Sequence, residues 1–258
     1  MTEADSASRP VTIRAQNISK SYGDFAALSD VSFQVRKGTV AAFLGVNGAG
    51  KSTTMRILTG YLAPTVGKVE VLGFDPTDHV ARIELARRLG YMPESGPLYR
   101  DMTPFESLQF FVDLRGLDDA TKRIDRVVER CAIGSVLHKP IHKLSKGYRQ
   151  RVGMAQTLLH DPEVLILDEP TSGLDPLQIR EVRALIRELG KDKTILLSTH
   201  ILQEVDAVAD VVVMIHDGRI VFTGGKDELA GPSHGSQGGG LEARFYELTG
   251  AKPAKEVA

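Results

Sequence analysis

A glycine-rich loop between an apolar run and a helical pattern is the feature that most constrains how this chain can fold. The loop covers residues 45–53 and reads GVNGAGKST, which fits the phosphate-loop pattern G-x-x-x-x-G-K-[ST]. The apolar run at residues 40–44 before it predicts a buried strand, and the spacing of apolar residues after it predicts a helix. Because the motif requires this strand, loop and helix order, the sequence predicts an α/β fold around a phosphate site.

The residue types in this loop suit the binding of a polyphosphate. Its glycines allow successive backbone N–H groups to wrap phosphate oxygens, and the helix N-terminus adds partial positive charge. Lys51 can reach the outer phosphates, and the Ser52 hydroxyl can hold Mg²⁺. A glycine-rich turn that merely ends in Lys-Ser is the alternative, and the flanking patterns argue against it. The residues expected to bind the nucleotide are Gly45, Val46, Asn47, Gly48, Ala49, Gly50, Lys51, Ser52 and Thr53.

Two adjacent carboxylates follow a second apolar run. Residues 164–167 predict a buried strand, and Asp168 and Glu169 come directly after it, where ligands bind in open α/β sheets. Their side chains point in different directions, so they can take different roles. We expect Asp168 to support Mg²⁺ through its water shell and Glu169 to accept a proton from an attacking water. An acidic turn without a chemical role is the alternative.

Charge and composition restrict the classes of partner. Lys and Arg total 32 against 33 for Asp and Glu in 258 residues, so no global charge favours nucleic acid. The single cysteine, Cys131, excludes an internal disulfide, and its position on an apolar helical face indicates a buried residue. No apolar run approaches about 18 residues, and the first ten residues predict a loose tail rather than a secretory signal. We therefore expect a cytoplasmic protein that reaches a membrane only through another chain.

The remaining patterns indicate how the chain is divided. Alternating apolar residues at 31–35 predict a strand that forms an antiparallel hairpin with residues 40–44. A capping sequence at 103–106 begins a helical subdomain at about residues 95–160. Strands return at 164–167 and 194–198, and a hairpin is expected across 211–223. We expect a nucleotide-binding domain at 1–230, a Gly/Ser-rich linker at 231–240, and a short C-terminal helix and tail at 241–258.

A further motif, Leu144-Ser145-Lys146-Gly147-Tyr148, resembles the signature sequence of ATP-binding cassette (ABC) ATPases, whose usual form is LSGGQ. With the phosphate loop and the paired carboxylates, this resemblance extends from about Val11 to Phe222. It implies an α/β fold with a P-loop NTPase core, a mixed sheet, an antiparallel β subdomain and an inserted helical subdomain. It also implies that two chains pair head to tail, each ATP lying between one chain's phosphate loop and the other's signature.

The signature residues suit an anion that arrives from another chain. Ser145 can cap a helix, and the N–H groups of Lys146 and Gly147 can form a second anion site. The resemblance implies further ATP contacts, each with a structural alternative. Tyr22 matches the aromatic residue that stacks on adenine, or is an ordinary half-buried tyrosine. Asp175 matches the loop between paired domains, or is only a helix cap. The residues expected to contact ATP from the second chain are Ser145, Lys146, Gly147, Tyr148 and the dimer-loop residue Asp175.

Two further assignments concern catalysis and the metal. His200 matches the family's switch histidine near the γ-phosphate, although a histidine at a strand end is often structural. Glu94 stands where the family usually has a Gln that touches Mg²⁺ and relays to the membrane subunit. The carboxylate of Glu94 can bind Mg²⁺ more strongly than a Gln amide, but whether it also relays to the membrane subunit stays open. The resemblance thus gives Glu169 and His200 as catalytic residues and Ser52, Glu94 and Asp168 as metal ligands.

Two departures in the signature point to one branch of the family. Lys146 replaces the first signature glycine and Tyr148 replaces the final Gln, whereas Gly147 remains. Lys146 can add positive charge beside the γ-phosphate. Such variants resemble the exporter branch of multidrug, antibiotic-resistance, gliding-motility and nitrous-oxide-maturation ATPases.

The resemblance therefore implies an ATPase subunit of an ABC exporter that uses ATP and Mg²⁺. Its expected partners are a second ATP-binding subunit, as a homodimer, and a separate membrane-spanning permease that holds it at the cytoplasmic face of the membrane. No nucleic acid is expected. One alternative is a soluble ABC ATPase acting on ribosomes or DNA, but the sequence shows no second cassette, zinc-binding cysteines or long coiled coil. The other is a non-hydrolysing nucleotide-binding regulator, which the presence of Glu169 and His200 disfavours.

Overall fold

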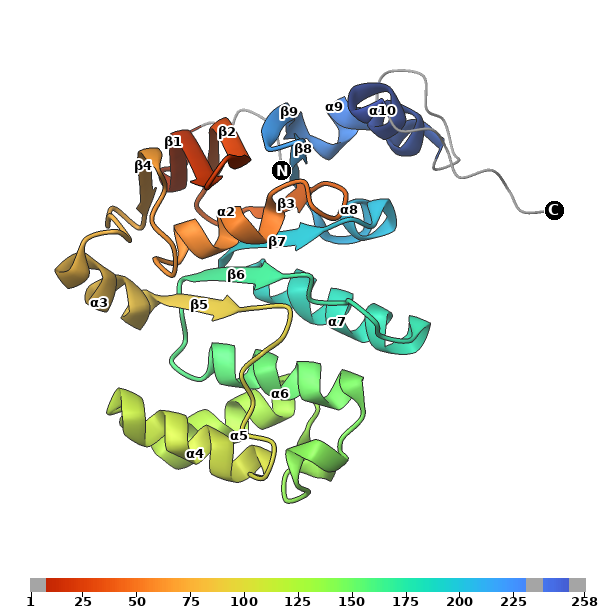
Figure 1. The fold of residues 1–258 in the computed structure, drawn as a ribbon. Coiled ribbons are helices and arrows are strands. Elements are labelled where there is room, and N and C mark those ends of the chain that lie inside the picture. The colour runs from red at the N-terminus through yellow and green to blue at the C-terminus, as the bar shows by residue number, and fades with distance from the viewer. Residues whose placement is uncertain (1–7, 231–238, 251–258) are drawn as a thin grey trace.

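A computed structural model of the protein describes residues 8–230 and 239–250 and shows two sheets, the helices that cover them and a helical lobe (Figure 1). Most of the expected N-terminal tail, linker and C-terminal tail, at residues 1–7, 231–238 and 251–258, lies outside these residues. Within the described part of the chain, no helix is both long and apolar enough to cross a membrane.

The central sheet has six strands in the order β5-β6-β7-β3-β8-β9. Five run parallel, and β9 pairs antiparallel with β8, so the sheet is mixed. Every residue of β3, β6 and β7 is buried, which explains the continuous apolar runs in the sequence. Because the strands are parallel, the loops that follow β3, β5, β6 and β7 meet at one edge. The strands are β3 (Val40–Leu44), β5 (Leu89–Met92), β6 (Val164–Asp168), β7 (Thr194–Thr199), β8 (Val211–His216) and β9 (Arg219–Gly225).

The second sheet is antiparallel and corrects one prediction. It contains β1 (Val11–Tyr22), β2 (Phe25–Arg36) and β4 (Val66–Val71) in the order β2-β1-β4. The expected hairpin between residues 31–35 and 40–44 is wrong, because β2 pairs with β1 and β3 enters the central sheet. The burial of the strands gives the reason. From Leu28 onward β2 largely alternates buried with more exposed residues and covers one face, whereas β3 is buried on both faces and suits a sheet interior.

Helices connect and cover the sheets. Helix α2 (Lys51–Leu58) lies between the two sheets, and its Met55, Ile57 and Leu58 pack in a core with residues of both (Figure 1). The others outside the lobe are α3 (His79–Arg88), α7 (Pro176–Leu189), α8 (Leu202–Val208), α9 (Lys226–Ala230) and α10 (Gly239–Thr249). Phe245 of α10 is buried in a cluster with residues of β3 and β8, so this helix packs on its own domain.

The helical lobe comprises α4 (Pro104–Arg115), α5 (Ala120–Arg130) and α6 (Lys146–Leu158), with short 3-10 turns at Gly134–Val136 and Ile141–Lys143. Thr103 and Glu106 form the capping box that the sequence predicted at the start of α4. Cys131 is buried, as expected, and burial raises the pKa of its thiol to about 12.

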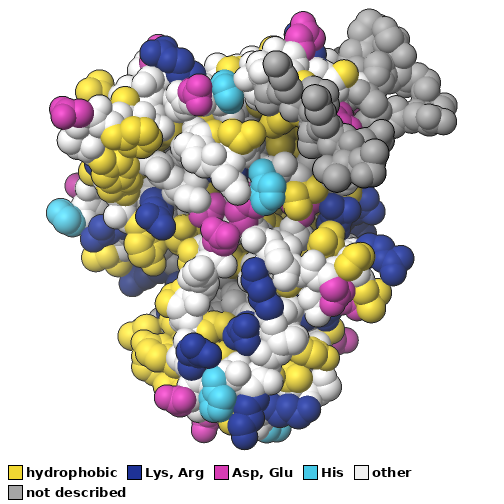
Figure 2. Space-filling view, turned by 45° about the vertical axis from the view of Figure 1, so that its right-hand side comes forward, with side chains coloured by type: hydrophobic (Ala, Val, Ile, Leu, Met, Phe, Trp, Pro, Cys, Tyr) yellow, Lys and Arg dark blue, Asp and Glu magenta, His cyan; other side chains and the backbone are white. Residues whose placement is uncertain are grey.

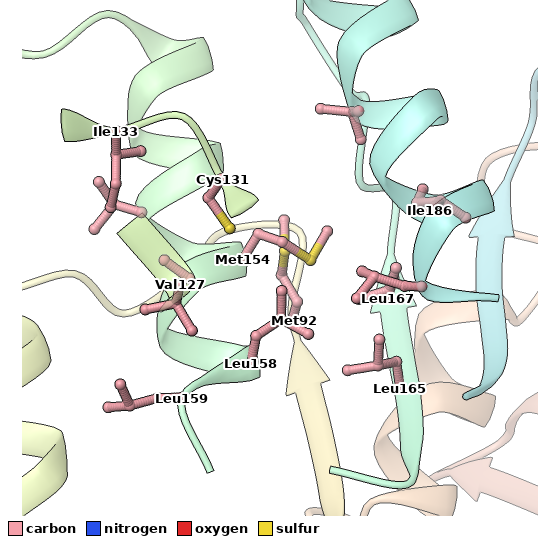
Figure 3. Close-up of a cluster of buried hydrophobic side chains, with 14 of the residues drawn as sticks. Met92, Val127, Cys131, Ile133, Met154, Leu158, Leu159, Leu165, Leu167 and Ile186 are labelled. Atoms are coloured by element: carbon pink, nitrogen blue, oxygen red, sulfur yellow. The ribbon is translucent and has the colours of Figure 1, made fainter. Parts of the chain in front are cut away.

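One apolar cluster joins this lobe to the central sheet (Figure 3). Met154 and Leu158 of α6 face Met92 of β5 and Leu165 and Leu167 of β6 in this cluster. Burying a side chain of this size contributes about 1.5–3 kcal/mol. Helix α6 is therefore held by core packing against the strand that ends in Asp168.

Candidate functional site

A pocket of about 470 Å³ at the carboxyl edge of the central sheet brings together most of the predicted site residues. On this face acidic side chains gather in the middle, with Lys and Arg side chains on the lobe below (Figure 2). The pocket is lined by Tyr22, Phe25, Ala27, Asn47, Gly48, Gly50, Lys51, Ser52, Thr53, Glu94, Glu169, Ser172 and His200.

The phosphate loop ends at the N-terminus of α2, as the motif requires. Gly50 is the residue before the helix and has φ of 108°, which favours glycine. A Cβ at Gly50 would lie 2.6 Å from Leu28 Cδ2 and 2.9 Å from the Ala27 carbonyl oxygen, so no larger residue fits there without rearrangement. The first backbone N–H groups of α2 lack partners within the helix, so its N-terminus is suited to an anion.

Lys51 is held by the loop and by one carboxylate. Its Nζ donates to the carbonyl oxygens of Gly45, at 2.8 Å, and Val46, at 3.2 Å. It also forms an ion pair with Glu169 Oε1 at 3.1 Å, in which the two side chains are only 5% and 9% exposed. The lysine thus links the phosphate loop to the turn after β6.

The paired carboxylates point in different directions, as expected. Asp168 Oδ1 accepts hydrogen bonds from Ser198 Oγ at 2.5 Å and from Ser52 Oγ at 3.3 Å. Glu169 instead faces Lys51, and its backbone N–H donates to Ser198 Oγ at 3.0 Å. Glu169 has φ of 50°, an unusual conformation for a residue before proline. Such a conformation costs about 1–3 kcal/mol, and the surrounding contacts must hold it.

His200 follows β7 and contacts Glu169 directly. Its Nδ1 lies 2.9 Å from Glu169 Oε2, and its side chain is 40% exposed. Because a carboxylate oxygen accepts hydrogen bonds, we assign Nδ1 as the donor in this contact. Glu169 therefore binds Lys51 through one oxygen and His200 through the other.

The oxygen atoms near Ser52 suit Mg²⁺. Mg²⁺ prefers oxygen ligands and usually binds one or two carboxylates together with substrate phosphates. Ser52 and Asp168 are in contact, and Glu94 Oε1 lies on the pocket wall, where it accepts a hydrogen bond from Ser172 Oγ at 3.4 Å. Among the described residues no group of three or more His, Cys, Asp or Glu could hold a metal ion. The donor set fits a metal that is bound partly by phosphates, and the three ligand assignments stay predictions.

Two aromatic rings lie at the pocket wall. Tyr22 and Phe25 are opposite each other across a two-residue turn between β1 and β2, and they are 48% and 65% exposed. Tyr22 was predicted as the adenine-stacking residue, whereas Phe25 was not. The position of Phe25 just after the turn at Gly23, opposite Tyr22, was the feature of the sequence that could have indicated its place at the pocket.

The signature residues and Asp175 lie elsewhere on the surface of the same chain. Ser145 caps α6 by accepting a hydrogen bond from the Tyr148 N–H, and Ser145 and Lys146 are exposed. Tyr148 is half-buried in the lobe, where its hydroxyl lies 3.3 Å from Ser135 Oγ. Asp175 caps α7 through the N–H groups at the helix start. None of these residues is among those that line the pocket in the described structure.

Lys146 and Gly147 pack against the segment that contains Asp175. The Lys146 ammonium lies so close to Gly173 that a Cβ there would overlap it. A Cβ at Gly147 would likewise overlap the Gln178 side chain of α7, so glycine permits this close approach. The structure thus brings the signature next to the Ser172–Asp175 loop of its own chain.

Three further residues contact the site and were not predicted. Ser198 and Thr199 end a buried parallel strand, and this position was the signal that could have identified them. Glu204 of α8 accepts hydrogen bonds from Thr171 and Thr199, and the sequence around it gave no comparable signal.

Comparison with known proteins agrees with these motifs. A family model described as ABC transporter matches residues 28–172, and a second, described as an AAA domain, matches residues 140–206. The chain is 38% identical over 211 residues to the bacitracin transport ATP-binding protein BcrA of Bacillus licheniformis, covering 81% of this chain and 68% of the relative. It is 37% identical to the lantibiotic transport ATP-binding protein SrtF of Streptococcus pyogenes, covering 81% and 89%. A solved structure of an ATP-binding subunit of an ABC transporter superposes with a TM-score of 0.79 at 32% identity, over 92% of this chain and 99% of that one.

Proposed function

Because this chain belongs to the ABC transporter family, as an ATP-binding subunit that hydrolyses ATP, we propose that two copies share two ATP molecules and drive export through a separate membrane subunit. The observation that carries the proposal is the division of the predicted residues between two surfaces. The phosphate loop, Glu169 and His200 line one pocket, whereas Ser145 and Lys146 are exposed outside it.

Each residue of the pocket has a proposed role in hydrolysis. The N–H groups at the start of α2 and the Lys51 ammonium bind phosphate oxygens, and the exposed Tyr22 ring stacks on the adenine. Glu169 accepts the proton of the attacking water, and His200 orients that carboxylate through Nδ1. Mg²⁺, when bound by Ser52, Asp168 and Glu94, would neutralise charge on the phosphates.

The second surface completes the site in the partner copy. The N-terminus of α6 offers backbone N–H groups to an anion, and the ammonium of the exposed residue Lys146, which lies beside Gly173, adds positive charge near it. Asp175 is exposed on the neighbouring loop, so the same surface can meet the partner copy. A homodimer of this kind contains two equivalent composite sites.

A surface of this chain next to Glu94 is suited to contact with the membrane partner. A second pocket, of about 330 Å³, lies between the Glu94 loop and the start of α6, and includes Leu98 and Arg100. Tyr99 and Phe110 are exposed beyond it, with ring centroids 5.5 Å apart. We propose that the permease contacts this surface and holds the subunit at the cytoplasmic face of the membrane. The names of the bacitracin and lantibiotic relatives support export as the direction of transport.

A mixing experiment tests the shared sites. Lys51→Ala removes the phosphate contact, and Ser145→Arg blocks the signature, so each variant alone should have little ATPase activity. A mixture of the two should regain activity, because each heterodimer contains one intact site. Glu129→Arg, which adds an arginine on the exposed face of the lobe, is the matched control and should be active alone. A mixture that forms dimers by light scattering and stays inactive would contradict the sharing of sites.

A further inference from the structure

Glu204 joins two segments that carry the proposed catalytic pair. The residue is only 2% exposed, and it lies on α8, beyond the pocket wall. Its Oε1 accepts a hydrogen bond from Thr171 Oγ1, and its Oε2 accepts one from Thr199 Oγ1 at 2.6 Å. Thr171 lies two residues after Glu169, and Thr199 immediately precedes His200. One buried carboxylate therefore connects the turn after β6 to the end of β7.

The turn that contains Glu169 needs such support. Its left-handed φ of 50° is unfavourable before Pro170, so contacts on both sides must hold it. On the N-terminal side, Ser198 Oγ accepts the Glu169 N–H. On the C-terminal side, Glu204 holds Thr171, the first residue after the proline.

The same carboxylate restrains His200. Thr199 Oγ1 donates to Glu204 and accepts the Ile201 N–H at 3.0 Å, so the backbone on both sides of His200 is tied to α8. Because His200 Nδ1 contacts Glu169 Oε2, a shift of either segment changes the geometry of that contact.

Burial of a carboxylate here requires a reason beyond packing. An apolar side chain of similar size would be less costly to bury. Burial is the largest effect and raises the pKa of Glu204. The hydrogen bond from Thr199 and the charges of Arg183 and His200 lower this pKa, and the charge of Glu169 raises it. The two hydroxyl hydrogen bonds give the carboxylate an orienting effect that an apolar residue would lack.

We propose that Glu204 is a positioning residue for ATP hydrolysis, fixing the Glu169 turn and His200 relative to each other through Thr171 and Thr199. The inference rests on the catalytic roles proposed above for Glu169 and His200.

The first test separates turnover from nucleotide binding. Glu204→Ala should lower kcat by roughly 30- to 100-fold, because a displacement near 1 Å can cost about 10²-fold. The affinity for ATP should change less than about threefold, since Glu169 keeps its charge beside Lys51 and the contacts of Lys51 with the phosphate loop are untouched. Glu204→Gln should retain part of kcat, because its amide oxygen still accepts one hydroxyl. Val208→Ala, a truncation of another buried residue on α8, is the control and should lower Tm while leaving kcat near that of the wild type.

A double-mutant cycle tests the proposed connection. Thr171→Val should lower kcat, and Thr171→Ser, which keeps the hydroxyl, should largely restore it. Combining Thr171→Val with Glu204→Ala should add little to the loss from Glu204→Ala alone, since both remove the same hydrogen bond. If Glu204→Ala does not fold, Glu204→Gln and the Thr171 variants still decide the question.

The outcomes distinguish this inference from the proposed function. Full additivity in the cycle, or a kcat for Glu204→Ala equal to that of Val208→Ala, would overturn the role of Glu204. If those results occur while Glu169→Gln is inactive, the role of Glu169 stands. Wild-type turnover by Glu169→Gln would instead overturn the proposed catalytic role on which the inference rests.

Discussion

The ion pair between Lys51 and Glu169 predicts that Glu169→Gln changes ATP binding as well as turnover. The two charged atoms lie 3.1 Å apart and both side chains are almost buried, so solvent screens the pair weakly. A phosphate that binds Lys51 must compete with this carboxylate. Hydrogen bonds to charged groups contribute about 1.5–3 kcal/mol, so removing the competing charge should tighten ATP binding by roughly 10- to 150-fold. Loss of the proton acceptor should at the same time slow turnover by roughly 10²- to 10⁴-fold.

Two measurements on the purified chain separate these effects. Equilibrium binding of a fluorescent ATP analogue in the presence of Mg²⁺ gives the affinity, and single-turnover hydrolysis gives the rate of the chemical step. Size-exclusion chromatography should show that a dimer accumulates when Glu169→Gln binds ATP. Glu94→Gln, measured at saturating Mg²⁺ so that its proposed metal contact does not limit binding, is the matched control, because it neutralises a carboxylate of the same pocket that contacts Ser172.

The control decides between the ion pair and general charge. If Glu169→Gln and Glu94→Gln tighten ATP binding equally, the effect comes from the net charge of the pocket and the competition with Lys51 is refuted. If Glu169→Gln hydrolyses ATP at the wild-type rate, Glu169 is not the proton acceptor.

Three other predictions follow from the pocket and the core. Tyr22→Ala should weaken ATP binding by roughly five- to 150-fold, as expected for a stacking contribution of about 1–3 kcal/mol. Tyr22→Phe keeps the ring and should bind ATP nearly as well as the wild type. Equal losses of affinity for the two variants in a binding titration would show that the hydroxyl matters. Glu94→Gln should raise the Mg²⁺ concentration needed for hydrolysis and Glu94→Ala should raise it further, so superimposable Mg²⁺ titrations would exclude a metal contact. Burial lowers the pKa of His160 to about 4 from 6.5, so its neutral form is favoured in the folded state. Stability should therefore fall by about 3 kcal/mol as the pH drops from about 6.5 to 4. His160→Gln should flatten that part of the profile in urea denaturation, and an unchanged slope would contradict the assignment.

Features with a local physical cause could be predicted from the sequence. The phosphate loop depends on glycines within one turn, and the structure gives Gly50 the positive φ that this turn requires. Thr103 and Asp175 cap α4 and α7 as expected, because a capping side chain bonds to N–H groups two or three residues away. The apolar runs of β6 and β7 likewise indicated their burial, because a strand covered on both faces needs apolar residues at successive positions.

Features that depend on distant parts of the chain could not be predicted. The partner of β2 is β1; the continuous apolar run of β3 indicates a strand buried on both faces, but nothing within residues 25–44 identifies β1 as the partner of β2. The position of Lys146 beside Gly173 depends on how the lobe packs on the sheet. The buried contacts of Glu204 depend on the fold of α8 against two strand ends. In each case the alternation and spacing of residues give no information on the partner.

The turn after β6 shows why such distant contacts matter for function. Its unusual φ at Glu169 costs about 1–3 kcal/mol, and three hydrogen bonds from different elements oppose that cost. Ser198 of β7 accepts the Glu169 N–H, Gln150 of α6 donates to the Pro170 carbonyl oxygen at 3.0 Å, and Glu204 of α8 holds the residue that follows. The two hydrogen bonds between neutral groups contribute about 0.5–1.5 kcal/mol each and the one to the Glu204 carboxylate about 1.5–3 kcal/mol, so the three together are large enough to offset a strain of about 1–3 kcal/mol. A movement of α6 or α8 can therefore change the position of the Glu169 carboxylate without any contact between those helices and the nucleotide in the pocket of the same chain.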